Sequence, residues 1–236
     1  MSYSFKGRVR YSEIGENGCL TLAGIQDYYQ DCCTFQSEEI GQGMEVLEKR
    51  RRAWVLSSWQ IIVERYPKMG ETITAVTAPY NFKGFLGMRN FILETEAGER
   101  LSWANSIWTN IDTQTGLPVR LTDEDTKGYV LDEKLDMDYA PRKITLPQDM
   151  TEEEPFVIQK HHLDTHHHVN NCQYIRMAAD YLPEEFVIRQ MRAEYKKQAL
   201  LGDVFYPWIK SEEKKITIAL STENREPYAI VEFTKK

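Results

Sequence analysis

All five histidines of this 236-residue chain lie between positions 161 and 168. They belong to the run His161-His162-Leu163-Asp164-Thr165-His166-His167-His168, which is followed at once by Val169-Asn170-Asn171. Imidazole is the side chain whose charge changes nearest neutral pH, and it acts as a general acid, a general base or a metal ligand. Because the run also contains a carboxylate and opens a predicted helix, we expect the chemistry of the protein to be located here.

Three other interpretations of this cluster stay open. An expression tag is disfavoured, because the run is internal and is interrupted by Leu-Asp-Thr. For His161 and His167 taken singly, a solvated polar loop is the better interpretation. A metal site is the sharper alternative, since His and Asp both bind zinc, but the spacing matches no standard zinc pattern and there is no His-Glu-x-x-His. We therefore expect no metal and no other cofactor.

Composition limits the class of protein. A hydrophobic content of 42% and a charged content of 28% are typical of a soluble globular chain. The net charge of −7 argues against nucleic acid as the main partner. No apolar run reaches membrane-spanning length, and the N-terminal residues lack the apolar stretch of a signal peptide, so we expect a cytoplasmic protein without a membrane partner. Four cysteines without CxxC spacing are expected to be reduced thiols, namely Cys19, Cys32, Cys33 and Cys172.

One segment departs from this acidic character, the basic run Lys49-Arg50-Arg51-Arg52. Four consecutive cations most often form a solvated loop. The same run is also what the docking of an acidic partner requires, because opposite charge steers the encounter. Both interpretations are kept.

A weak internal repeat organises the chain. The segments 20–31 and 169–180 align, with apolar residues at three- and four-residue spacing in both, and both segments end on Asp. This spacing predicts two amphipathic helices. The expected caps are Thr21 for the first helix, and Asn170 or Asn171 for the second, which Leu182-Pro183 ends.

Each predicted helix is followed by four predicted strands rich in aromatic and β-branched residues. In the first half they cover residues 54–65, 72–78, 86–95 and 100–110, and in the second half 187–199, 204–210, 215–221 and 227–233. A helix that lies across a curved antiparallel sheet covers only one face of that sheet. Two such units side by side can continue their sheets into one and share an interface. We predict an α+β fold with a domain at 1–111, a surface linker at 112–155 and a second domain at 156–236. The linker allows a short helix near 122–131.

These features resemble the acyl-acyl carrier protein thioesterases, which are double hotdog proteins. The resemblance extends along nearly the whole chain, and its most specific part is Asp164 with His168-Val169-Asn170-Asn171-x-x-Tyr174-Ile175. His-Val-Asn-Asn before a helix is shared more widely among hotdog thioesterases, whereas the duplication and the Trp-rich first half point to the narrower family. Further matching segments are Trp59 to Glu71, Ser102-Trp103, Trp108 to Asp112, Glu194 to Lys197 and Gly202-Asp203.

The resemblance implies a catalytic set with two departures from the family pattern. Asp164 and His168 carry over directly. The family has Asn where this chain has His166, and a catalytic Glu where it has Gln198, late in the long strand. A neutral amide cannot accept a proton, so either Asp164 or a histidine acts as the base or the enzyme is slow. Glu194 is an alternative base, although we prefer to interpret it as a strand-surface charge facing Lys196.

The implied substrate is a fatty acyl thioester, hydrolysed to a free fatty acid during fatty acid biosynthesis. Asn170, Asn171 and the aromatics Trp54, Trp59 and Trp103 are the expected substrate-binding residues, and the first half would provide the acyl slot. The basic run at Lys49 to Arg52 favours acyl carrier protein as the partner. An acyl-coenzyme A thioesterase, a non-catalytic acyl-binding protein that has lost its base, and a metal-dependent enzyme remain the alternatives. A monomer and a homodimer are both compatible with the sequence.

Overall fold

The computed structural model describes residues 2–236 and divides into two compact units. One unit contains the residues up to 57 and residues 61–139, and the other contains residues 58–60 and 140–236. The helices are α1 (Leu22–Glu39), α2 (Met44–Lys49), α3 (Asp123–Thr126) and α4 (Asn171–Ala179). The strands are β1 (Tyr3–Arg8), β2 (Arg52–Val63), β3 (Thr72–Lys83), β4 (Leu86–Thr95), β5 (Arg100–Asp112), β6 (Thr151–Glu152), β7 (Phe156–Val157), β8 (Ile188–Tyr195), β9 (Val204–Ser211), β10 (Lys215–Ser221) and β11 (Pro227–Lys235).

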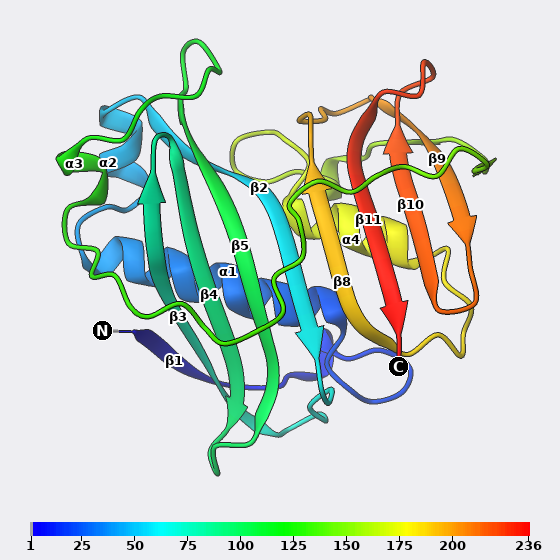
Figure 1. The fold of residues 1–236 in the computed structure, drawn as a ribbon, viewed down its shortest axis with the longest axis horizontal. Coiled ribbons are helices and arrows are strands. Elements are labelled where there is room, and N and C mark those ends of the chain that lie inside the picture. The colour runs from blue at the N-terminus through cyan, green and yellow to red at the C-terminus, as the bar shows by residue number, and fades with distance from the viewer. Residues whose placement is uncertain (1) are drawn as a thin grey trace. The chain divides into compact units, whose positions relative to one another are not determined.

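The first unit is one long helix laid on a sheet. Its strands follow the order β1-β3-β4-β5-β2, and α1 packs against β1 and β3 (Figure 1). Side chains of a strand alternate between the two faces of a sheet. On β4, Phe91 points toward the helix, where its ring lies 5.0 Å from that of Tyr29. Both rings are buried, and they form part of the core between helix and sheet.

The second unit repeats this plan on a smaller scale. Its strands follow the order β8-β11-β10-β9-β6, β7 pairs with β9, and α4 packs against β10 and β11 (Figure 1). Phe205 and Tyr174 stack with ring centroids 5.6 Å apart and both are buried. The second helix is therefore anchored to its sheet by aromatic packing.

The segment between β5 and β6 contains little regular structure and is held by side chains of the sheets. In the first unit, the Asn90 carboxamide oxygen accepts hydrogen bonds from the Leu135 amide at 3.0 Å and the Tyr139 hydroxyl at 2.9 Å. In the second unit, Arg192 donates to the carbonyl oxygens of Pro141 and Lys143. The segment thus forms no strand of its own up to residue 150.

The helix-then-four-strands order that the sequence predicts is confirmed in both units. Thr21 caps α1 by accepting from the Gly24 amide at 3.0 Å, and Asn170, not Asn171, caps α4 by accepting from the Cys172 amide at 2.8 Å. The short helix expected near 122–131 is limited to α3. Elements that the sequence pattern missed are β1, α2, β6 and β7.

Candidate functional site

The histidine-containing segment forms a closed loop around Asp164. One carboxylate oxygen of Asp164 accepts the backbone N–H of His166 at 2.8 Å and that of His168 at 3.2 Å. The Asp164 amide in turn donates to the His168 carbonyl at 2.8 Å. His167 has a φ of 60° in the left-handed region, which lets the chain turn tightly inside this loop. The carboxylate therefore fixes the backbone on which His168 stands.

This loop delivers His168 to the beginning of α4. Leu163 and Val169 form an isolated β-bridge that closes the loop, and Asn170 then caps the helix. The His168 side chain is partly exposed, whereas that of His166 is exposed. The structure thus brings Asp164, His166 and His168 together in one turn and holds His168 two residues before the cap.

Most backbone amides around the start of α4 already have acceptors. The first N–H groups of a helix have no partner inside it. Here neighbouring groups satisfy nearly all of them, and among the described residues only the Asn171 N–H in this stretch has no acceptor. The bonds that are made join Val169 N to Ala199 O, Asn170 N to His162 O, Cys172 N to the Asn170 side chain, and Gln173 N to Asn170 O.

Gln198 does not lie in the long strand where the sequence analysis placed it. Strand β8 ends at Tyr195, because the chain then turns and the amides of Lys196 and Lys197 both donate to the Tyr228 carbonyl. Gln198 lies in this turn, is exposed, and its side chain has no hydrogen bond among the described residues. The Ala199 carbonyl accepts the Val169 amide at 2.9 Å, which ties the turn to the residue that follows His168.

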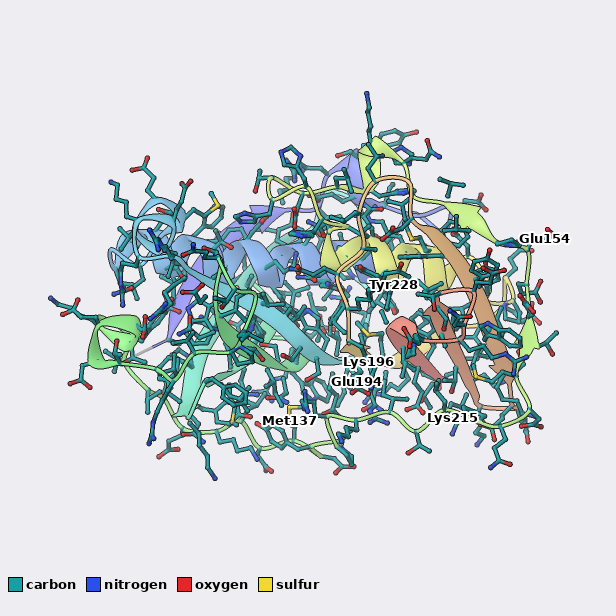
Figure 2. All side chains as sticks on the ribbon, turned by 90° about the horizontal axis from the view of Figure 1, so that it is seen from above. Met137, Glu154, Glu194, Lys196, Lys215 and Tyr228 are labelled. Carbon is teal, nitrogen blue, oxygen red and sulfur yellow. The ribbon has the colours of Figure 1, made fainter. Side chains whose placement is uncertain are left out.

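Glu194 is not the strand-surface charge that the sequence analysis preferred. It is buried, with an exposed fraction of 4%. One oxygen accepts the Ile144 amide at 2.9 Å and the other lies 3.3 Å from the Lys196 ammonium group. Figure 2 shows Glu194 and Lys196 beside each other in the second unit. The predicted contact with Lys196 is therefore confirmed. The other carboxylate oxygen of Glu194 binds the backbone of the segment between β5 and β6 at Ile144.

His161 and His162 lie just ahead of the loop, in a single 3₁₀ turn (Lys160–His162). Their rings are 4.1 Å apart, and His162 Nδ1 accepts the Gln159 amide at 3.0 Å. Burial and the neighbouring His161 lower the pKa of His162. The His162 carbonyl accepts the Asn170 amide, so this residue supports the loop through its backbone.

The three tryptophans that the sequence analysis assigned to substrate binding have different environments. Trp54 packs against Phe82 with ring centroids 6.2 Å apart. Trp59 is buried with an exposed fraction of 2%. On β5 the register pairs Ala104 with Phe91, which faces α1, so the adjacent Trp103 points to the opposite face of its sheet. Trp103 is thus outside the helix-facing core of the first unit.

The basic run has acquired partners within the first unit. Arg50 donates to the buried Asp125 at 2.7 Å, and Arg52 lies 3.8 Å from the same carboxylate and 3.6 Å from Asp112. Lys49 and Arg51 are exposed. Lys49 is paired with Glu45, at 3.7 Å across the helix surface, and Arg51 bonds the neutral side chain of Gln114. Half of the run therefore stabilises the fold, and half presents charge to solvent.

Two tyrosines that the sequence analysis did not assign to the site connect β8 with α4. The hydroxyl of Tyr195 donates to the Asn171 carbonyl at 3.0 Å. The hydroxyl of Tyr174 accepts the Ala199 amide at 3.2 Å. Their rings meet edge to face at 5.7 Å. The only signal in the sequence is the presence of Tyr174 in the motif after Asn171 and of Tyr195 at the strand end.

Within residues 2–236, no group of three or more His, Cys, Asp and Glu side chains is arranged to hold a metal ion. Over the same residues, no helix has both the length and the apolar character needed to cross a bilayer.

The chain matches two family models and several curated proteins. The family model described as the acyl-ACP thioesterase N-terminal domain matches residues 1–129, and the model of the C-terminal domain matches residues 145–232. A chloroplastic acyl-[acyl-carrier-protein] hydrolase of Cuphea viscosissima is 24% identical over 214 residues, which are 83% of this chain and 51% of that protein. The chain spans about half the length of the first curated relatives it matches.

Solved structures with the same fold cover the chain completely. An acyl-ACP thioesterase from Bacteroides thetaiotaomicron has a TM-score of 0.89 at 20% identity, with 100% of this chain and 98% of that chain covered. A 12:0-ACP thioesterase from Umbellularia californica has a TM-score of 0.86 at 18% identity, with 100% and 97% covered. These likenesses establish the double hotdog fold, and together with the two domain models they show that the chain belongs to the acyl-ACP thioesterase family.

Proposed function

We propose that this protein hydrolyses fatty acyl-acyl carrier protein thioesters and releases free fatty acids in fatty acid biosynthesis. The observation that carries the proposal is the loop in which Asp164 fixes His168 immediately before the start of α4. Family membership supports the thioester as substrate, because the curated relatives are named as acyl carrier protein hydrolases and thioesterases.

His168 is the group placed to act on the attacking water. Hydrolysis requires water to lose a proton as it adds to the thioester carbonyl, and a neutral imidazole accepts such a proton. The backbone of His168 is held by hydrogen bonds to Asp164 through both its N–H and its carbonyl, so the backbone that carries the ring has a fixed position. The other Asp164 oxygen has no hydrogen bond among the described residues, which leaves it available to orient the water or the imidazole.

The oxyanion that forms during attack needs a hydrogen-bond donor aimed at it. The Asn171 amide is the donor that the start of α4 leaves unused, and the positive end of the helix dipole favours negative charge at the same place. Collapse of the tetrahedral intermediate breaks the C–S bond, and the proton taken from water passes to the departing thiolate. Asn170 contributes by holding the helix start, since its side-chain oxygen is occupied as the cap.

Gln198 takes the place of the family's general base. Its amide group can donate a hydrogen bond to water or accept one, but it cannot remove the proton. Loss of a general base is worth about 10²–10⁴-fold in rate, so the proposed enzyme relies on His168 or Asp164 for this step. The same consideration keeps a non-catalytic acyl-binding protein as the second candidate function.

Carrier-protein docking is proposed for Lys49 and Arg51, the two exposed members of the basic run. Lys49 is paired with Glu45, which is itself highly exposed, and Arg51 bonds the neutral side chain of Gln114. A matched substrate panel tests the whole proposal. The purified protein is assayed against acyl-acyl carrier protein and acyl-coenzyme A of several chain lengths, with His168→Ala as the control. Faster turnover of the carrier-protein substrates is expected. Preference for coenzyme A would favour the other enzyme class, and acyl binding without turnover would favour the non-catalytic protein.

A further inference from the structure

The turn that carries Gln198 is fixed by hydrogen bonds on both sides of that residue. Ahead of it, the amides of Lys196 and Lys197 donate to the Tyr228 carbonyl at 2.9 and 3.2 Å. After it, the Ala199 carbonyl accepts the Val169 amide. Among the described residues, Gln198 itself makes no hydrogen bond, either through its side-chain carboxamide or through its backbone N–H. The hydrogen bonds of its neighbours therefore fix the position of the Gln198 backbone, while its side-chain carboxamide is free to bind water.

Tyr174 supplies the remaining hydrogen bond of this turn. It lies on the first turn of α4, and its hydroxyl accepts the Ala199 amide at 3.2 Å. Both residues are buried, with exposed fractions of 2% and 0%. A buried N–H that loses its acceptor is destabilised unless the backbone moves to find another. The hydroxyl therefore controls where the backbone after Gln198 can lie.

The ring of Tyr174 is held independently of its hydroxyl. It stacks on Phe205 at 5.6 Å and meets Tyr195 edge to face at 5.7 Å. Burial raises the pKa of its phenol above the ordinary value. The hydroxyl therefore stays protonated at neutral pH, and replacement of Tyr174 by Phe removes one hydrogen bond while it keeps the aromatic packing.

We propose that Tyr174 is a positioning residue for hydrolysis, which acts by holding the Ala199 amide and thereby fixes Gln198 beside the loop that carries His168. This inference rests on the proposed function, since it assigns Gln198 a part in placing the attacking water. Displacement of a water-placing group by about 1 Å reduces turnover by up to about 10²-fold. Gln198 places water only as accurately as its backbone is held.

The test combines kinetics with amide exchange. Tyr174→Phe is expected to lower kcat about tenfold, with KM for acyl-acyl carrier protein changed less than about twofold, because substrate binding does not require the hydroxyl. In a Gln198→Ala background the same substitution should have almost no further effect, since both changes remove one function. The control is Tyr80→Phe, which removes the hydroxyl that donates to Asn105 at 2.9 Å in the first unit and should leave kcat unchanged.

Amide exchange of Ala199 tests the hydrogen bond without any activity. The wild-type amide should exchange slowly, and Tyr174→Phe should accelerate it by at least about tenfold while the amide of Val169 stays protected. Fast exchange in the wild type, unchanged kcat in a folded Tyr174→Phe variant, or independent losses in the double variant would each overturn the inference. Absence of any thioester hydrolysis by the wild type would instead contradict the proposed function, and exchange would still decide whether the bond exists.

Discussion

Replacement of Arg50 by Ala should destabilise the fold, although the sequence alone suggests a surface docking charge. The Arg50 guanidinium donates to Asp125 at 2.7 Å, to the Gln42 side chain at 3.1 Å and to the Glu124 carbonyl at 2.9 Å. Asp125 has an exposed side-chain fraction of 2%. The substitution would leave its carboxylate with two hydrogen bonds from Thr122 and with Arg52, 3.8 Å away, as its remaining cation.

The magnitude follows from how far the pair is removed from water. Breaking a fully buried ion pair by removing one partner typically lowers the free energy of unfolding by about 3–5 kcal/mol. Arg50 retains a quarter of its side-chain exposure, and Arg52 Nε remains 3.8 Å from Asp125, so part of this loss is offset. We expect a decrease of about 2–3 kcal/mol.

Urea unfolding measures this decrease, and carrier-protein kinetics measure the other role of the run. Lys49→Ala and Arg51→Ala remove exposed charges and should change the free energy of unfolding by less than about 0.5 kcal/mol. The same two variants should raise KM for acyl-acyl carrier protein roughly twofold to threefold and weaken its salt dependence, with small thioesters unaffected. Equal stability of Arg50→Ala and Lys49→Ala would refute the division of the run into structural and docking residues.

Further predictions concern the site itself. His168→Ala should reduce turnover by at least about a hundredfold with the fold intact, and near-normal activity would remove the central assignment. Chelators should leave activity unchanged, whereas activity lost to chelator and restored by zinc would support the metal alternative. Gln198→Glu should raise turnover modestly at neutral pH. If the new carboxylate repels Asp164, the acidic limb of the pH–rate profile should move upward, and a large loss at every pH would show that the amide itself places the water. The pKa of His162 is lower in the folded state than in the unfolded state. The free energy of unfolding should therefore fall as pH drops from about 7 through the unfolded-state pKa of about 6.5. His162→Gln should reduce this dependence on pH.

Local patterns predicted the elements well because the signals that define them are local. Thr21 and Asn170 precede amphipathic segments and do cap the two long helices. The strand that was placed at 187–199 ends at Tyr195 instead, because its last residues bond to Tyr228, more than thirty positions later in the chain. Nothing in the local sequence reports a partner at that distance.

Partners that are distant in the sequence also explain why the environments of Arg50 and Glu194 were not predicted. Arg50 is neutralised by Asp125, which lies 75 positions away in the chain, and Glu194 is buried because Ile144, 50 positions before it, donates to it. Long-range partners of this kind depend on the folded topology, whereas the loop around Asp164 is formed by five consecutive residues, Asp164 to His168. The loop was therefore predictable from the sequence, and the partners of isolated charges were not.

The hydrogen bonds around α4 also limit how this site can tolerate change. Asp164, Asn170 and the Ala199 carbonyl each use an oxygen to hold the backbone near His168, and among the described residues of this stretch only the Asn171 backbone N–H has no acceptor. A site whose donors are committed to its own backbone is rigid before substrate arrives, and rigidity lowers the reorganisation needed in the transition state. If Gln198 stands where the family has a catalytic Glu, as the resemblance implies, a base is missing but this framework is in place. In the proposed mechanism the framework would then supply oxyanion stabilisation, while the rate of proton removal would depend on His168 and Asp164.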